Sequence, residues 1–186
     1  MTGVRRARAG DLPAILAISN DAAERSTANF AVEPESLADW RASFATTQDA
    51  YPWLVAEHDG RVIGFAKASP WKGRCAYAYS AEISVYIEPG HQGRGAGRAL
   101  YEVLFDALER QGYQTLLAGI TQPNVASVRL HESFGMTRAA VFHAVGWKFD
   151  AWHDVGYWER RLQSAGEPPR DLRPVGDVLG ESAAPR

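Results

Sequence analysis

The segment from Ser84 to Tyr101 constrains the fold of this chain more than any other, and it reads SVYIEPGHQGRGAGRALY. A β-branched apolar run ends before Pro89, a glycine-rich bend follows, and an amphipathic helix begins directly after the bend. The first backbone N–H groups of a helix have no partner inside the helix, and the helix dipole favours negative charge there. The segment therefore predicts a strand, a bend and a helix that together bind a ligand carrying phosphate.

Two familiar phosphate-binding loops do not match this bend. The P-loop requires Gly-Lys-Ser/Thr at its end, and the chain contains no such string. The dinucleotide fingerprint fails as well, because Arg98 stands where a pattern starting at Gly93 and Gly95 needs its last glycine. What remains is the pattern Q-x-x-G-x-G, from Gln92 to Gly97, placed between a strand and a helix.

Composition limits the classes of protein to which the chain can belong. Its 186 residues suit one domain, and 46% apolar with 23% charged residues is typical of a soluble globular protein. A formal charge of −2 gives no reason to expect nucleic acid or an anionic membrane as a partner. The Arg-rich start has no apolar run after it, so we expect no secretory signal and a cytoplasmic protein. The single cysteine, Cys75, suits a reducing cytoplasm, and a small structural residue is a more economical interpretation of it than a nucleophile.

Periodicity and turn signals predict an α+β protein with a mixed sheet. The predicted helices start at Asp11, at Ser36, at residue 97 and at Asn124. The predicted strands are 4–8, 53–57, 62–69, 81–87, 115–120, 136–145 and 154–161. We expect one domain over residues 1–163, followed by a flexible or surface-draped tail over 164–186, which is rich in Pro, Gly, Arg and Glu.

The Q-x-x-G-x-G bend and this order of elements resemble the GNAT family of N-acetyltransferases, over about residues 4–161. The resemblance implies the GNAT acyl-CoA N-acyltransferase fold, a mixed central sheet with flanking helices, and acetyl-CoA as co-substrate without a metal. It implies a cofactor site made by the backbone of the strand before the bend, by the bend and by the start of the next helix. Its predicted members are Val85, Tyr86, Ile87, Gln92, Gly93, Arg94, Gly95, Ala96, Gly97, Arg98 and Asn124. Arg94 and Arg98 can equally be solvated surface residues, and Asn124 can also be a plain helix cap.

Two further residues are candidates for proton transfer. Glu82 lies inside an otherwise apolar strand, where burial raises the pKa of a carboxyl group, and we interpret it as the general base. The alternative is a structural salt bridge. His131 stands seven residues after Asn124, where the family commonly has a tyrosine that protonates the leaving thiolate. A histidine at this position can serve as acid or base near neutral pH.

Several strings are similar to the phosphinothricin and methionine sulfoximine/sulfone N-acetyltransferases, among them STANF at 26–30, PWKGR at 70–74 and WHDVG at 152–156. Members acetylate the α-amine of a small amino acid and work as homodimers with active sites near the subunit interface. The resemblance implies that Arg74 and Tyr77 recognise anionic groups of the substrate and that Phe30 and Trp71 wall the pocket. Tyr101 is expected to reach the same cavity. His153 and Asp154 are interpreted as structural.

The chain departs from this branch at Cys75 instead of Asn, at Tyr79 instead of Trp, at Val125 instead of Asp after the asparagine, and in the intervening residues of the glycine bend. These departures leave acetyl transfer intact but leave the acceptor open. The alternatives are an acetyltransferase for a peptide, a protein N-terminus or another amine, and a non-catalytic acetyl-CoA-binding domain. The last alternative predicts loss of the acid or the base, yet Glu82 and His131 are both present.

Overall fold

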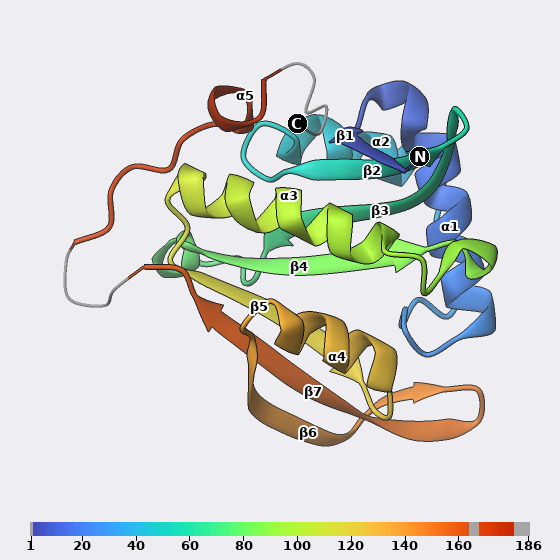
Figure 1. Cartoon of the computed structure of the whole chain (residues 1–186). Helices are drawn as coiled ribbons and strands as arrows, with labels where there is room; N and C mark the ends of the chain where they lie inside the picture. Colours follow the sequence, from blue (N-terminus) through green and yellow to red (C-terminus); the bar gives the residue numbers. More distant parts are fainter. Residues whose placement is uncertain (1, 164–167, 181–186) are drawn as a thin grey trace.

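The structure is a computed structural model, and it describes residues 2–163 and 168–180 (Figure 1). The elements follow one another as β1 (Gly3–Arg6), α1 (Leu12–Arg25), α2 (Leu37–Thr47), β2 (Trp53–His58), β3 (Arg61–Pro70), β4 (Ser80–Ile87), α3 (Ala96–Gln111), β5 (Thr115–Thr121), α4 (Val125–Ser133), β6 (Thr137–Lys148), β7 (Ala151–Arg161) and α5 (Val175–Val178). This order confirms the predicted α+β layout around a mixed sheet. In the described part of the chain, no helix has the length and apolar character needed to cross a membrane.

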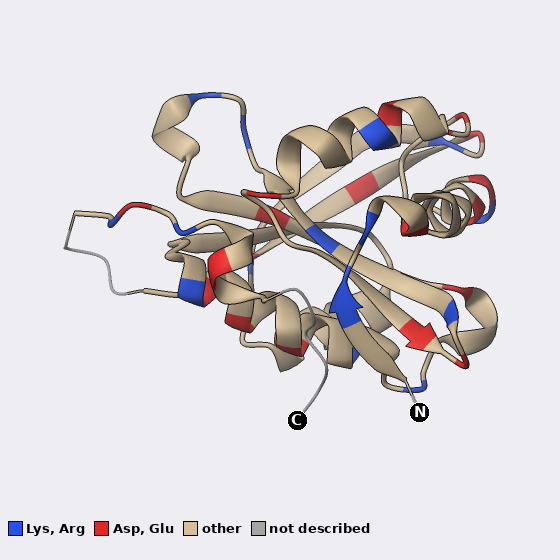
Figure 2. Cartoon of the chain, turned by 90° about the horizontal axis from the view of Figure 1, so that it is seen from above, with Lys and Arg blue, Asp and Glu red and all other residues tan. Residues whose placement is uncertain are grey.

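The seven strands form one sheet in the order β1-β2-β3-β4-β5-β7-β6. All neighbouring strands are antiparallel except β4 and β5, which are parallel. Helix α3 crosses one face of the sheet, and α1 and α2 cover the other face (Figure 1). Acidic and basic residues are interspersed over these elements (Figure 2).

Each face of the sheet has its own apolar core, as the alternation of side chains along the strands requires. On one face α3 buries Leu100, Leu104 and Leu108 against β2 to β5. On the other face Trp40 and Phe44 of α2 pack edge-on against Trp53 and Phe65 with α1. Even-numbered residues of β4 point to the face covered by α1 and α2, and odd-numbered residues point to the face covered by α3.

The parallel pair β4–β5 comes apart part-way along its length. Residues Ser80 to Glu82 pair with Thr115 to Leu117, and the pairing ends there. From 83 to 87, β4 keeps its antiparallel partner β3 but has no partner on the β5 side. Figure 1 shows the two strands diverging from this point. The chain therefore holds an unpaired strand edge inside its own sheet, which folded proteins otherwise avoid.

The last two strands are longer than the sequence predicted. They run over 137–148 and 151–161 and are joined by a two-residue turn at Phe149 and Asp150, both with positive φ. Such a turn favours Asn or Gly, so the Phe-Asp pair gave no turn signal. The hairpin β6–β7 extends beyond the body of the sheet (Figure 1).

Part of the tail is buried rather than flexible or draped over the surface. Val175, Val178 and Leu179 are at most 5% exposed and belong to the same apolar core as the buried residues of α3. The Gln111 side chain and backbone both bond to the backbone of Arg173, which fixes the segment before α5 to the end of α3. The prediction followed composition and overlooked three apolar residues at helical spacing. The other positions of the predicted tail, 164–167 and 181–186, lie outside the described residues.

Candidate active site

The glycine bend lies at the mouth of the opening between β4 and β5. Gly93 and Gly95 have φ of 71° and 90°, a left-handed conformation that residues with a Cβ rarely adopt. Gly95 is the N-cap of α3, and residues Gln92 to Gly95 are exposed. Gly97 has a different role, because a Cβ there would lie 3.4 Å from Leu130 of α4. These glycines shape the bend and let two helices approach each other.

Three polar side chains lie around the bend, and each has a different environment. The Gln92 amide donates a hydrogen bond of 2.9 Å to the carbonyl of Ile87 and ties the bend to the end of β4. Arg98 is paired with Glu102 at 3.1 Å, so its charge is already partly compensated. Arg94 is exposed beside the free N–H groups of the first turn of α3. The backbone, together with Arg94, thus offers positive potential to an anion here.

The predicted backbone site on the strand coincides with its unpaired edge. Val85, Tyr86 and Ile87 all fall in the part of β4 that lacks a β5 partner. The side chains of Val85 and Ile87 pack against the core under α3, whereas Tyr86 stacks on Phe65 at 5.3 Å on the opposite face. The edge therefore offers backbone N–H and C=O groups to an extended ligand.

Glu82 is the last residue of β4 that pairs with β5, so it stands where the opening begins. Its side chain is half-buried, and burial raises the pKa of this carboxyl group, while the nearby charge of Lys72 lowers it. Gly119 leaves room beside it, since a Cβ at Gly119 would lie 3.6 Å from Glu82 Oε1 and 3.3 Å from the ring of Tyr157. Over residues 2–163 and 168–180 Glu82 forms no ion pair, which disfavours the structural salt bridge.

His131 is buried, and both of its ring nitrogens are engaged. Nδ1 lies 2.7 Å from the carbonyl oxygen of Ser127 and must donate to it, so the neutral ring accepts at Nε2 from the Tyr101 hydroxyl at 2.8 Å. Burial lowers the pKa of His131, and burial raises that of Tyr101 well above its usual value. The acid or base role of His131 stays a prediction, and this arrangement supports a positioning role. Tyr101 is fully buried in this pair, and its expected contact with substrate stays a prediction.

Asn124 is the N-cap of α4, where its side-chain oxygen accepts a hydrogen bond of 3.1 Å from the Ser127 N–H. The capping interpretation is thereby confirmed, and a contact with the cofactor stays a prediction.

The other four residues predicted to bind substrate lie in two separate places. Phe30, in the loop after α1, packs against Gly146 and lies 6.2 Å from the His153 ring, both on the hairpin β6–β7. Trp71 and Tyr77 contact each other at 5.2 Å in the loop between β3 and β4, where Arg74 is exposed. The structure therefore brings none of this second group into contact with Phe30.

Two lysines near these elements were missed by the sequence reasoning. Lys67 interrupts the apolar strand β3 and lines a cavity behind the sheet. Lys148 is buried, and its ammonium donates to the carbonyls of Ala23, Ser26 and Asn29, which tie the end of α1 and the loop before Phe30 to the hairpin. For Lys67 the signal was the same as for Glu82, a charge inside an apolar strand, whereas Lys148 is the last residue of β6 and gave no such signal. His153 and Asp154 also bond within the hairpin, to Lys148 O and to the Ala144 N–H.

Comparison with known proteins defines the class to which this fold and opening belong. The Acetyltransferase (GNAT) family model matches residues 15–136, and the chain belongs to this family. Its relatives include the phosphinothricin N-acetyltransferase of Streptomyces viridochromogenes, 43% identical over 94% of this chain and 95% of that protein. A methionine sulfoximine/methionine sulfone acetyltransferase of Salmonella typhimurium is 41% identical over 63% of this chain and 69% of that protein. Among solved structures, a phosphinothricin acetyltransferase of Sinorhizobium meliloti in complex with acetyl-CoA is similar, with a TM-score of 0.87, 30% identity and 97% of both chains covered.

Proposed function

We propose that this protein is an N-acetyltransferase that moves the acetyl group of acetyl-CoA to the α-amine of a small amino acid such as phosphinothricin, methionine sulfoximine or methionine sulfone. The observation that carries the proposal is the unpaired edge of β4, which starts directly after Glu82 and ends at the glycine bend. The relatives named phosphinothricin and methionine sulfoximine acetyltransferases supply the class of acceptor.

The residues present fit acetyl-CoA, which supplies an activated acetyl thioester when bound. The N–H groups of Gly93 to Arg98, with Arg94, are placed for a pyrophosphate. Val85, Tyr86 and Ile87 offer their backbone to an extended arm, as a strand edge receives another strand. A backbone N–H of this edge would polarise a carbonyl that is held against it.

Glu82 is the proposed general base. An amino acid arrives with its amine protonated, and only the neutral amine is a nucleophile. The Glu82 carboxylate takes this proton, directly or through water, and its pKa, raised by burial, brings its basicity closer to the operating pH. His131 is proposed as the acid or base that handles the proton of the leaving thiolate, and its hydrogen bond to Tyr101 also holds α4 to α3 beside the opening.

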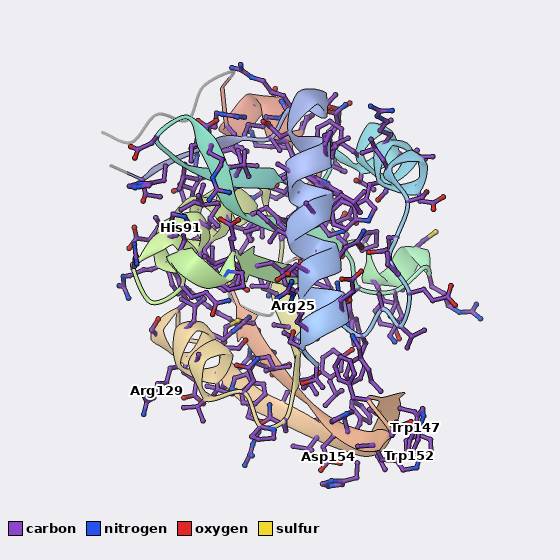
Figure 3. All side chains as sticks on the ribbon, turned by 90° about the vertical axis from the view of Figure 1, so that its right-hand side faces the viewer. Arg25, His91, Arg129, Trp147, Trp152 and Asp154 are labelled. Atoms are coloured by element: carbon purple, nitrogen blue, oxygen red, sulfur yellow. The ribbon has the colours of Figure 1, made fainter. Side chains whose placement is uncertain are left out.

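We further propose a homodimer that acts in the cytoplasm, where the exposed Cys75 thiol stays reduced. Five large apolar residues of the hairpin β6–β7 are each more than half exposed: Phe142, Val145, Trp147, Phe149 and Trp152. Trp147 and Trp152 lie together at the outer end of the hairpin (Figure 3). An apolar patch of this kind marks an interface. A partner seated on it would lie close to Phe30, which packs against the same hairpin.

One assay tests the activity and separates it from its main competitor. Purified protein is mixed with acetyl-CoA and a panel of amines, and release of free thiol is recorded. The panel contains phosphinothricin, methionine sulfoximine, methionine sulfone, ordinary amino acids and a peptide. We expect the highest kcat/KM among the small amino acids. Turnover of the peptide alone would replace the proposal by a peptide acetyltransferase, and binding of acetyl-CoA without turnover would favour a non-catalytic domain.

A further inference from the structure

A cavity of about 300 Å³ lies behind the sheet, between its face and the helices α1 and α2. Its floor is formed by Lys67 of β3 with Ser84 and Tyr86 of β4. Ser19, Asn29, Trp40 and Ser43 form the walls, and Glu35 and Asp39 stand at the exposed rim. The volume suits one small molecule, and the lining offers several hydroxyl groups around a single cation.

Lys67 is the unusual member of this lining because its charge has no matched partner. Its ammonium lies 4.8 Å from the centroid of the Trp40 ring and 4.5 Å from that of the Trp53 ring, so two aromatic faces cover part of it while it still borders the cavity. Within the described part of the chain, Nζ makes neither a hydrogen bond nor an ion pair. Burial lowers the pKa of Lys67, and the charge of Glu35 opposes that shift. Lys67 is half-buried, so its ammonium has lost part of its hydration without gaining an acceptor, and an anion entering the cavity would offset that loss.

The cavity shares a sheet face with the proposed base. Lys67 pairs with Ser84, and Ser69 pairs with Glu82, so Glu82 lies one step along the same face. Lys67 and Glu82 are thus diagonal neighbours, offset by about 6.6 Å along the strands and by about 4.8 Å across them. Burial raises the pKa of Tyr86, which lines the cavity, and the charges of Glu35 and Glu82 add to the rise, so both carboxylates lie near this residue. An amino acid with its amine at Glu82 can therefore reach Lys67 with a side chain of two methylenes and a terminal acid group.

The two rim carboxylates do not cancel the charge on the floor. Glu35 and Asp39 are exposed, and Asp39 already accepts a hydrogen bond of 2.6 Å from the Ser36 hydroxyl. Their fields pass through solvent, which screens them, whereas the field of Lys67 acts between aromatic rings. The acids at the rim and the cation on the floor match a zwitterion that enters with its anionic end first.

We propose that Lys67 is a specificity-determining residue that binds the anionic end of the acceptor's side chain, and that the preferred acceptors are α-amino acids whose side chain ends in a phosphinate or carboxylate. This inference rests on the proposed function, since it places the acceptor's amine at Glu82. It ranks the acceptors by charge, with phosphinothricin above the neutral methionine sulfone.

The test compares these two acceptors, because both carry a tetrahedral, methyl-bearing end group and they differ in its charge. Lys67→Met and Lys67→Gln remove the cation, Lys67→Arg keeps it, and Arg41→Met removes an exposed cation of α2 outside the cavity as a control. We expect Lys67→Met and Lys67→Gln to lower kcat/KM for phosphinothricin by roughly 10- to 100-fold, mainly through KM, as loss of a charge-assisted contact does. In the same two variants, kcat/KM for methionine sulfone should stay within about 3-fold of the wild-type value. Lys67→Arg should retain the preference for phosphinothricin. Arg41→Met should match the wild type with both acceptors.

The outcomes separate this inference from the proposed function. Equal losses for both acceptors in the neutral variants, or a wild-type preference for the sulfone, would overturn the role of Lys67 and leave the acetyltransferase intact. Failure of the wild-type protein to acetylate any small amino acid would overturn the proposed function itself. Melting temperatures of all variants show whether a loss reflects unfolding, and at least one neutral variant that melts like the wild type decides the question.

Discussion

At the scale of single residues, the chemistry depends on one carboxyl group in an unusual position. Glu82 is half-buried in a strand whose other face belongs to the apolar core, and it has no ion-pair partner among the described residues. A charged group in such a place is retained at a cost in stability, which is typical of functional sites. Lys72 acts on it only through space, from the exposed loop after β3.

Glu82→Gln should lower kcat by about 10²- to 10⁴-fold, the usual contribution of a general base. Affinity for acetyl-CoA and the melting temperature should be retained, because a neutral amide is no harder to bury than a carboxylate. The wild-type pH–rate profile should fall as pH drops through the pKa of Glu82, at a higher pH than an ordinary carboxyl group would give. Steady-state kinetics over a pH series measures all of these quantities.

Lys72→Met provides an internal check on this assignment. It removes the cation that lowers the pKa of Glu82, so the acid limb of the profile should move to higher pH. Arg41→Met, which removes an exposed charge on α2, should leave the limb in place. A near-normal kcat for Glu82→Gln across the pH range would exclude Glu82 as the base.

At the scale of elements, the bend before α3 requires glycine for a backbone reason. Gly95→Arg should abolish measurable binding of acetyl-CoA in calorimetry, because φ of 90° is strained for any side chain and the new side chain stands over the N–H groups of the helix. The strain should cost about 1–2 kcal/mol of stability and leave the fold intact.

Gly60→Arg is the matched control for this variant. Gly60 has φ of 74°, is exposed in the turn between β2 and β3, and has open space around it, so it reproduces both the strain and the added charge. Affinity for acetyl-CoA should be unchanged in this control. Equal affinity in Gly95→Arg and the wild type would contradict the assignment of the bend.

Lys148 connects three elements, and its loss should be costly. Lys148→Met leaves the carbonyls of Ala23, Ser26 and Asn29 without their common donor, in the place where a cation also favours the end of helix α1. We expect the free energy of unfolding in urea to fall by about 2–4 kcal/mol. Arg41→Met should change it by at most about 0.5 kcal/mol. A similarly small change for Lys148→Met would show that the three contacts contribute little.

At the scale of the whole molecule, the exposed aromatic end of the hairpin β6–β7 predicts self-association. The double variant Trp147→Ser, Trp152→Ser should weaken a dimer by at least about 10-fold in Kd, since exposed tryptophans are frequent interface anchors. Sedimentation of a concentration series measures this shift. Val125→Ser, which removes an exposed apolar residue from α4, is the control. A monomeric wild type, or an unchanged Kd in the double variant, would contradict the dimer.

The sequence predicted those parts of the molecule that local patterns determine. The glycine bend, the capping of α4 by Asn124 and the apolar stripe of α3 are all short-range signals, and each is present. The separation of β4 from β5 at Glu82 is a property of pairing between distant segments, so it could only be expected from the family. The buried pair of Tyr101 and His131 and the cavity around Lys67 likewise arise from packing between elements.

The burial of α5 and the length of the hairpin were missed for local reasons. The tail is rich in polar residues, Pro and Gly, so its three apolar residues at helical spacing were overlooked. The turn of the hairpin is made by Phe149 and Asp150, and without a glycine or asparagine it could not be recognised from the sequence. Both errors concern elements at the edge of the fold, and neither changes the position of Glu82 relative to the bend.

The most direct test of the central claim identifies the product of one reaction. The wild-type protein is incubated with acetyl-CoA and phosphinothricin, the free thiol is counted, and the acetylated product is assigned by NMR. We predict one equivalent of free thiol for each molecule of product, with the acetyl group on the α-nitrogen. Thiol release without an N-acetyl product, or no release at saturating phosphinothricin, methionine sulfoximine and methionine sulfone, would contradict this claim.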